Sequence, residues 1–328
     1  MLSSTNFWMC VAGLIYLAVG VFVIRKEISA ARGWEKLISL GCVFFAVPLA
    51  VFAPEHFRGP EFVKESVPSW MPVRWFWPYF VGCALVNGDD EEHRQNACSD
   101  RRCCQHFSSH SRRLFQQPHV AATSLTLRKF VRLSSTLLAL MFSLFVCMIY
   151  VPSALENPTE RFAWSLLLRD LSFAAGAWSL AGLYSRASSP QQSKWMILFG
   201  RIAIAIAAIF FGVEHFLHPN SAPGIPLPMM TPTWVPFPSL WAYLAGAILL
   251  AAGIALALNK KPRIAATSIG ALMTALTVFL YLPILILARG ESEVIVGLNY
   301  VADTLLYAGA ALLLAGALPR DPDRSEKM

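Results

Sequence analysis

The chain has 328 residues, of which 56% are hydrophobic and only 14% are charged, and it carries a formal net charge of +7. A soluble globular protein of this composition would expose large apolar surfaces to water. The composition therefore excludes a soluble globular domain and predicts an integral membrane protein.

Long apolar runs predict the membrane spans, because a helix needs about 20 apolar residues to cross roughly 30 Å of hydrocarbon. Eight runs reach this length, at 7–25, 37–54, 131–152, 163–185, 196–216, 240–258, 264–288 and 295–317. A ninth run over 75–86, WFWPYFVGCALV, stops after 12 residues. As a helix it would rise only about 18 Å, so the third of about nine spans is predicted to be truncated or disrupted.

Lysine and arginine are distributed unequally between the two sets of loops when 75–86 is counted as a crossing. Most of them fall in 25–36, 94–132, 186–194, 260–263 and 320–327, whereas the opposite loops carry only Arg58, Lys64, Arg74, Arg161 and Arg289. The positive-inside bias therefore predicts an outside N-terminus and a cytoplasmic C-terminus, in a multi-pass cell membrane protein, taken as one of the bacterial inner membrane. No motif accompanies the arginine-rich loop that would indicate nucleic acid, and the bilayer is the expected partner.

An internal repeat relates the two halves of the chain. Its anchors are Glu55-His56-Phe57 with Glu214-His215-Phe216, Trp70-Met71-Pro72 with Trp234-Val235-Pro236, Tyr79 and Gly82 with Tyr243 and Gly246, Arg132 with Arg263, Tyr150 and Pro152 with Tyr281 and Pro283, and Asp170 with Asp303. A fixed self-similarity of this kind is typical of repeated structural units. Four crossings return a chain to its starting side, so two parallel four-span units plus one leading helix are predicted.

The two units differ in one place. From Gly82 to Arg132 is 50 positions, whereas from Gly246 to Arg263 is 17, so the first unit carries 33 extra residues. The extra stretch begins with four consecutive acids at 89–92, which a hydrocarbon core does not accommodate. Either a short span is followed by a disordered cytoplasmic loop, or the stretch comes from a disturbed reading frame.

These observations predict an all-α polytopic transmembrane helical bundle with the following divisions. The expected parts are a leading helix in 1–30, a first unit in 31–188 that is interrupted by a polar insertion at about 87–130, a second unit in 189–318 and a cytoplasmic tail in 319–328.

The polar insertion contains a cluster of His93, Cys98, Cys103, Cys104, His106 and His110. Zinc sites usually take ligand pairs two to four residues apart, but two of these cysteines are adjacent and the chain has no CxxC motif. A zinc site at Cys98, Cys103, Cys104 and His106 is therefore not favoured. The remaining cysteines lie singly in apolar runs, where cysteine acts as a small hydrophobic residue.

Polar residues that occur at matching positions in both units form the candidate functional site. Each unit places a Glu-His pair at the outer end of a span and an aspartate roughly 10–12 Å deep in a later one. Buried acids at such depth usually face a bundle interior or a wet cavity. An outward-facing polar pocket is predicted from Glu214, His215, Asp303, Tyr281, Glu55, His56, Asp170, Arg169 and Tyr150.

A structural interpretation accounts for the same residues. The Glu-His pairs could mark helix ends, with Trp70 and Trp234 at the membrane interface. Arg169 could neutralise its neighbour Asp170, whereas Asp303 follows an alanine and needs a partner from elsewhere, which makes it the stronger functional candidate. Arg132 and Arg263 begin their spans on the cytoplasmic side and are interpreted as anchors.

A helix ending in His-Phe, a loop containing SWMP or TWVP, and YFVG or YLAG at the start of the next span resemble the DoxX-like family of four-span membrane proteins. Both units carry this pattern, so the chain resembles a tandem duplication. The family commonly has an acid three positions after the glycine, where this chain has Leu85 and Leu249. The resemblance implies membrane redox chemistry, because family members include a subunit of thiosulfate:quinone oxidoreductase.

Three functional hypotheses follow. The first is a non-catalytic or redox-associated membrane subunit of a quinone- or thiol-linked complex, with a membrane or peripheral redox partner protein. The second is a small-molecule or proton-coupled carrier or binding protein that uses the outward-facing polar pocket, and the third is a structural or assembly subunit. The sequence contains no GxGxxG, CxxC or CxxCH motif, so it assigns no cofactor independently. No residue is assigned a catalytic role, and a protein that is not an enzyme on its own is favoured.

Overall fold

The computed structural model describes residues 4–58, 73–76, 79, 81, 120–128 and 130–320. Several predicted features lie outside these residues: Trp70, most of the interrupted span, the acidic stretch, the Cys98 to His106 cluster and most of the C-terminal tail. The side chain of Glu55 is also outside the described part of the chain. The predictions that concern them stay predictions.

The described residues form helices, and all of them follow the predicted runs except α7, which lies within 87–130, the stretch predicted to be a polar insertion. They are α1 (Ser4–Ala30), α2 (Glu35–Ser39), α3 (Gly41–Arg58), α7 (Val120–Leu127), α8 (Val131–Phe145), η1 (Val146–Tyr150), α9 (Val151–Glu156), α10 (Arg161–Ser185), α11 (Pro190–Leu217), α12 (Pro238–Ala257), α13 (Pro262–Leu276), η2 (Thr277–Tyr281), α14 (Leu282–Leu287) and α15 (Glu291–Ala317). Within these ranges the only strand-like pairing is an isolated bridge between Ser221 and Met230. The all-α bundle is confirmed.

Six of these helical segments are long and apolar enough to cross a membrane: Asn6–Ala30, Val131–Glu156, Pro190–Leu217, Pro238–Ala257, Pro262–Leu287 and Glu291–Ala317. The predicted spans 37–54 and 163–185 are also helical. The apolar part of α3, Gly41–Ala53, is shorter than the six, and α10 is less apolar because it carries Arg169, Asp170 and several serines. The chain is therefore a multi-pass membrane protein.

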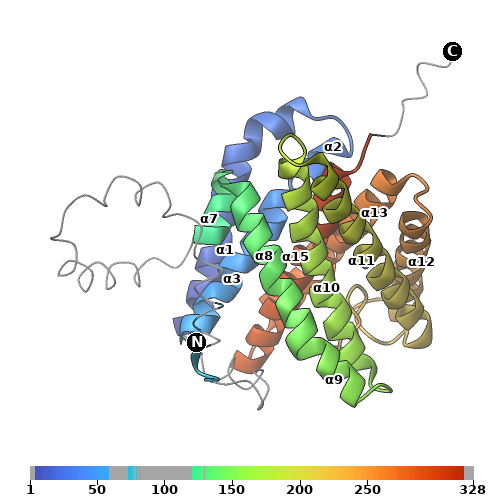
Figure 1. The fold of residues 1–328 in the computed structure, drawn as a ribbon. Coiled ribbons are helices and arrows are strands. Elements are labelled where there is room, and N and C mark those ends of the chain that lie inside the picture. The colour runs from blue at the N-terminus through green and yellow to red at the C-terminus, as the bar shows by residue number, and fades with distance from the viewer. Residues whose placement is uncertain are drawn as a thin grey trace.

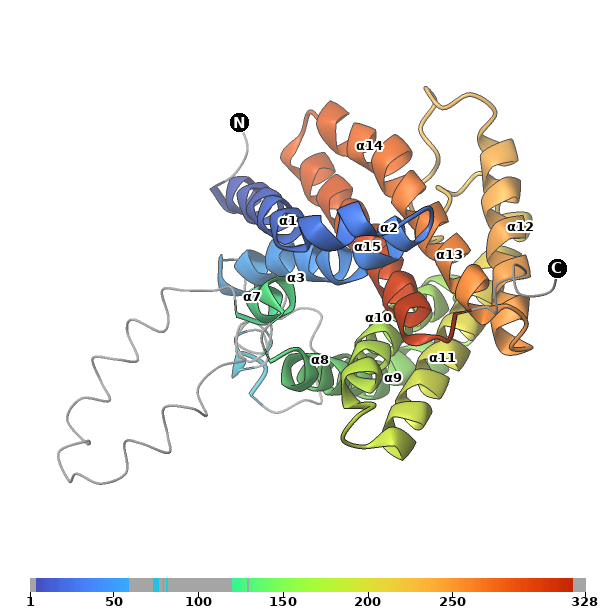
Figure 2. The same cartoon turned by 90° about the horizontal axis from the view of Figure 1, so that it is seen from above.

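Helix α15 is the centre of the bundle (Figure 1). The view from above shows α1, α3 and α7 on one side of it and α11 and α12 on the other (Figure 2). In its most apolar window 83% of the residues are buried, against 33–44% for the other five candidate spans. Its run of small residues from Ala308 to Ala311 lets neighbouring backbones approach closely, which favours helix association where lipid offers no hydrophobic driving force.

The first long helix of each predicted unit packs against the last helix of the other one: α3 against α15, and α11 against α10. Glycines make both contacts close. A Cβ atom on Gly41 would lie 3.1 Å from Leu312 Cβ, and one on Gly200 would lie 2.1 Å from Ser179 Oγ. The two crossings therefore use glycine at corresponding places of the two helices.

Two long helices share the same internal division. Helices α8 and α13 have 15 residues each, followed by π-helical segments of five residues and by α9 and α14 of six residues. Pro152 and Pro283 lie two residues after the π segments. Because proline has no N–H to donate to the preceding turn, the helix widens there, and each π segment ends in a tyrosine, Tyr150 or Tyr281.

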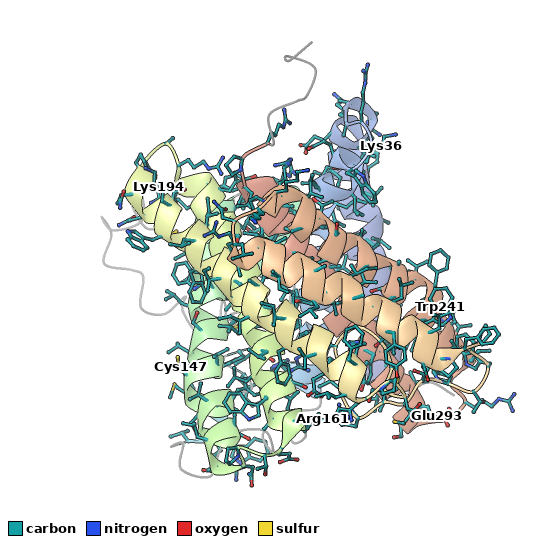
Figure 3. The ribbon with its side chains drawn as sticks, turned by 90° about the vertical axis from the view of Figure 1, so that its right-hand side faces the viewer. Lys36, Cys147, Arg161, Lys194, Trp241 and Glu293 are labelled. Atoms are coloured by element: carbon teal, nitrogen blue, oxygen red, sulfur yellow. The ribbon has the colours of Figure 1, made fainter. Side chains whose placement is uncertain are left out.

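One end of the bundle, called the basic end below, carries Lys36 and Lys194, while Arg161, Trp241 and Glu293 lie at the opposite end (Figure 3). Lys260 and Lys261 belong to the basic end, because the neighbouring Arg263 is bonded to Glu35 beside Lys36. This separation follows the predicted charge asymmetry. Which end faces the cytoplasm stays a prediction.

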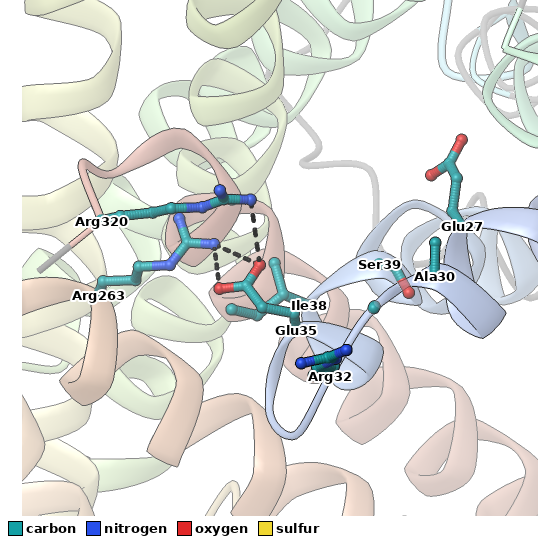
Figure 4. A pocket seen from close by; sticks show the side chains of 10 residues that line it. Glu27, Ala30, Arg32, Glu35, Ile38, Ser39, Arg263 and Arg320 are labelled. Atoms are coloured by element: carbon teal, nitrogen blue, oxygen red, sulfur yellow. Dashed lines mark hydrogen bonds and ion pairs between the residues drawn. The ribbon is translucent and has the colours of Figure 1, made fainter. Parts of the chain in front are cut away.

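The interpretation of Arg263 as a membrane anchor is wrong, because its side chain is buried at the basic end. Its guanidinium donates to both carboxylate oxygens of Glu35 at 2.8 Å (Figure 4). It also donates to the carbonyl oxygens of Ala315 and Leu318 at 2.8 and 3.0 Å. A cation at a helix C-terminus satisfies carbonyls that have no partner within the helix, so Arg263 fixes α13 to α2 and α15.

Gly309→Ala is expected to destabilise the protein by about 1–3 kcal/mol, the usual range for overpacking. A Cβ atom at this position would lie 2.5 Å from the backbone nitrogen of Phe45, and backbone cannot move aside as a side chain can. Gly316→Ala on the same helix is the control, because its Cβ would meet only Ile38 Cγ2 at 3.6 Å. Thermal unfolding in detergent measures both, and equal melting temperatures would contradict the expected close contact.

Candidate functional site

Arg169 of α10 lies between two buried carboxylates. Its Nε and Nη2 atoms donate to Asp170 Oδ2 at 3.0 and 2.8 Å, and its Nη1 donates to Asp303 Oδ2 of α15 at 2.8 Å. The exposed fractions are 4% for Asp170 and 7% for Asp303. The structure thus supplies the partner that Asp303 lacks in the sequence, and it is the same arginine that neutralises Asp170.

The hydroxyl of Tyr150 lies beside the carboxylate of Asp170. This tyrosine ends the π segment η1, so the widened turn before Pro152 brings it to the two acids. Arg169, Asp170, Asp303 and Tyr150 are called the arginine cluster below. Four of the predicted site residues therefore come together, from α10, α15 and the helix that contains η1.

The charges of the arginine cluster do not balance when both acids are ionised. One guanidinium faces two carboxylates, so one negative charge is left over among buried side chains. An uncompensated ion inside a protein or a bilayer costs several kcal/mol. The cluster is therefore suited to hold a proton or to bind a cation.

A buried loop covers the cluster from the opposite end of the bundle. Residues 221–227, with the sequence SAPGIPL, are all buried although they belong to no helix; they are called the plug segment below. Its contacts include Ser165, four residues before Arg169, and a neighbouring residue binds Tyr300, three residues before Asp303. The plug segment therefore lies about one helical turn from the arginine cluster.

His215 and Tyr281 hold the centre of the plug segment. Nε2 of His215 accepts a hydrogen bond from the backbone N–H of Gly224 at 2.8 Å, and Nδ1 faces the carbonyl oxygen of Phe211. Nδ1 must therefore carry the hydrogen, and the imidazole is neutral in this arrangement. The hydroxyl of Tyr281 donates to the carbonyl oxygen of Pro223 at 2.7 Å.

Gly224 itself has a φ of +124°, a backbone conformation that residues other than glycine rarely adopt. Two further bonds hold the later part of the loop. Ser165 Oγ donates to the carbonyl oxygen of Pro226 at 3.3 Å, and the hydroxyl of Tyr300 accepts from the backbone N–H of Met229 at 3.0 Å. Tyr300 also stacks on Tyr281, with ring centroids 5.4 Å apart.

Glu214 takes part in a second ionic contact at the edge of the plug segment. Its carboxylate lies 3.2 Å from Nη1 of Arg161 and 3.8 Å from Nε2 of His218. Trp234 is exposed, and its place at the membrane interface stays a prediction. In the first half of the chain, Nδ1 of His56 lies 3.0 Å from the carbonyl oxygen of Phe52, the same local bond that His215 makes.

Apart from Glu55 and His56 in α3, the predicted pocket residues divide into three groups: the arginine cluster, the residues that hold the plug segment, and the Glu214 ion pair. Sequence reasoning missed Arg161, Ser165, Tyr300 and the plug segment itself. The available signal was the alternation of proline and glycine with apolar residues in APGIPLP, which is unusual for a solvated loop.

No group of three or more His, Cys, Asp or Glu side chains is placed to hold a metal ion within the described ranges. His215 has no nitrogen left for a quinone carbonyl or a haem iron while the plug segment is in this position, because both nitrogens are engaged.

Fold and site together define a multi-pass α-helical membrane protein with a buried ionic cluster. Residues 196–282, from α11 to the start of α14, match the family model DoxX. This match supports the predicted similarity to DoxX-like membrane proteins. No curated protein and no solved structure matches the chain.

Arg169→Gln is expected to destabilise the protein by about 3–5 kcal/mol, because it leaves buried carboxylates without their cation. Asp303→Asn should change stability much less, because it leaves a balanced pair of Arg169 and Asp170. The triple variant Arg169→Gln, Asp170→Asn, Asp303→Asn should recover most of the loss. Thermal unfolding in detergent ranks the stabilities of the three variants. A larger fall in melting temperature for Asp303→Asn than for Arg169→Gln would contradict the charge count.

Tyr281→Phe is expected to loosen the plug segment, because the buried carbonyl of Pro223 loses its donor. Leaving such a group unsatisfied costs about 1–3 kcal/mol. Limited proteolysis followed by mass spectrometry should detect faster cleavage in 218–237. Tyr243→Phe is the matched control, since Tyr243 is exposed and its ring stacks on Phe216; equal cleavage of the two variants would refute the role assigned to Tyr281.

Proposed function

We propose that the protein is a proton-coupled membrane carrier or small-molecule binding protein, with its exchangeable proton in the arginine cluster. The observation that carries this proposal is the single guanidinium of Arg169 between two buried carboxylates. A buried site with one unmatched negative charge takes up a proton or a cation readily. Acids of this kind recur as proton relays in membrane transporters.

Asp303 is the better proton carrier of the two acids. Asp170 receives two hydrogen bonds from Arg169, whereas Asp303 receives one. Hydrogen bonds to a carboxylate stabilise its charged form, so the less compensated acid holds the proton. Asp303 also belongs to the central helix α15, which packs against α3, α10 and α13. A change of charge at Asp303 would therefore affect the packing of all three helices.

The plug segment supports a function that needs controlled access. It lies between the arginine cluster and the opposite end of the bundle along α10 and α15. His215, Tyr281 and Ser165 hold it in place, and Tyr300 binds Met229 just after it. A carrier must close one side of its site while the other side is open. In this proposal the plug segment is the part that closes the opposite end.

Infrared difference spectroscopy on a pH step tests the proposal. The carbonyl stretch of a protonated buried carboxyl should appear in the wild-type protein and in Glu291→Gln, a control acid on the same helix, and should be missing in Asp303→Asn. An unchanged band in Asp303→Asn, or no such band in the wild type, refutes the assignment. Proton-dependent solute uptake into proteoliposomes should be lost in the same variant.

A redox-associated subunit is the second candidate, and the DoxX match at 196–282 favours it. In that function a quinone and a partner dehydrogenase would accompany the protein. Because both nitrogens of His215 are engaged, a quinone would need a displaced plug segment. Purification in mild detergent with identification of bound quinone and partner proteins distinguishes this candidate from a carrier. If Asp303 and His215 can both be replaced without any phenotype, the remaining hypothesis is a structural or assembly subunit.

We also infer that the chain is a tandem duplication with units at 31–188 and 189–318. Support comes from the identical division of α8–η1–α9 and α13–η2–α14. The glycine crossings at Gly41 and Gly200 add to it, as do the matching histidine bonds of His56 and His215. With the basic end assigned to the cytoplasm by charge bias, the plug segment faces outside.

A further inference from the structure

A groove of about 810 Å³ runs between α12 and α13 at the basic end. Its lining residues are Ile248, Ala251, Ala252, Ala255, Lys260, Lys261, Ile264, Ala265 and Ser268. Helix α12 lies at the edge of the bundle in both ribbon views (Figures 1 and 2). The groove is therefore on the surface that lipid covers.

The walls of the groove are made of small apolar side chains. Four alanines leave room between the two helices, while Ile248 and Ile264 form the sides. Ala251 is exposed and Ala255 is half-buried, so neither fills the space. A smooth apolar channel of this kind between two membrane helices fits a hydrocarbon chain, which makes no hydrogen bonds.

Two lysines close the groove where α12 turns into α13. The backbone N–H of Lys260 bonds to the carbonyl oxygen of Ala255 at 2.9 Å, and Lys261 has a φ of +45°, so the turn holds both at the mouth. Lys261 is also the residue before α13. The partial positive charge of that helix N-terminus adds to the two ammonium groups.

The positive charge of the groove is not neutralised from within. No Asp or Glu occurs among the described lining residues. A second cavity at the same end, of about 710 Å³, differs in this respect, since Glu27 and Glu35 line it together with Arg32, Arg263 and Arg320 (Figure 4). Its Arg263 is already bonded to Glu35. Of these two cavities in the described part of the chain, the α12–α13 groove is the one that combines cations with an apolar lining and no acid.

We propose that the α12–α13 groove is a binding site for an anionic phospholipid. The phosphate of the headgroup lies against Lys260 and Lys261, and one acyl chain follows the alanine-lined channel. Basic pockets between membrane helices on one side of the bilayer recognise acidic headgroups in this way. The site is independent of the arginine cluster and of the function proposed for it.

Native mass spectrometry of the full chain in neutral detergent tests the proposal, with phosphatidylglycerol and phosphatidylcholine of the same acyl chains in equal amounts. Retention of phosphatidylglycerol over phosphatidylcholine is expected, and Lys260→Gln/Lys261→Gln should reduce phosphatidylglycerol binding roughly 30-fold. The matched control is Arg32→Gln/Arg320→Gln, which removes two charges from the second cavity at the same end. The proposal is overturned if the lysine variant keeps the preference, or if the control loses it equally.

Two further experiments distinguish binding of the acyl chain from binding of the phosphate headgroup. Ala251→Leu/Ala255→Leu should weaken binding of phosphatidylglycerol while leaving both lysines. Because Ala251 is exposed and Ala255 only partly buried, the variant should stay folded, which its melting temperature checks. Glycerol 3-phosphate in excess should fail to displace the lipid. Displacement by this headgroup alone, or full lipid retention in the leucine variant, means that the site takes a free phosphate ester or none, and the lipid assignment is then wrong.

Discussion

The close packing of α15 against α10 and α3 is the constraint on which the rest of the structure depends. Lipid tails are as apolar as the side chains, so helices in a bilayer associate through contact rather than through exclusion of water. Gly309 and Gly176 bring the backbones to a distance at which a Cβ atom would not fit. The same approach brings Asp303 of α15 within reach of Arg169 of α10, so the apolar contact and the buried ionic cluster have one cause.

The plug segment depends on this arrangement in turn. Its bonds come from α10, α11 and η2, and α15 binds Met229 just after it. The relative positions of these four elements are set by the central crossings. Its own sequence contributes proline and glycine, which lower the entropy cost of an irregular path or permit φ values that other residues avoid. The histidine and tyrosines that first suggest chemistry therefore act as positioning residues for a loop, whereas the acids deeper in the bundle keep the unmatched charge.

The helical spans could be predicted from the sequence, because hydropathy and length are local properties. The repeat also predicted that Tyr150 and Tyr281 take part in a polar site. The partner of Asp303 could not be predicted, since Arg169 lies 134 positions earlier in the chain and only the crossing of two helices brings them together. Likewise, the burial of Arg263 could not be distinguished from interfacial anchoring, because both place an arginine at a helix start. Burial of residues 221–227 also depends on distant elements, which no window of sequence contains.

The two π segments have a consequence for how the helices could have arisen. A π turn accommodates one residue more than an α turn, so it is equivalent to a single inserted residue that the helix absorbs without breaking. Such an insertion rotates everything beyond it by about 100°, which changes the face that each later side chain presents. Tyr150 and Tyr281 stand at this rotation point in their helices. Each π segment therefore sets which face Tyr150 or Tyr281, and every later side chain of its helix, turns toward the bundle.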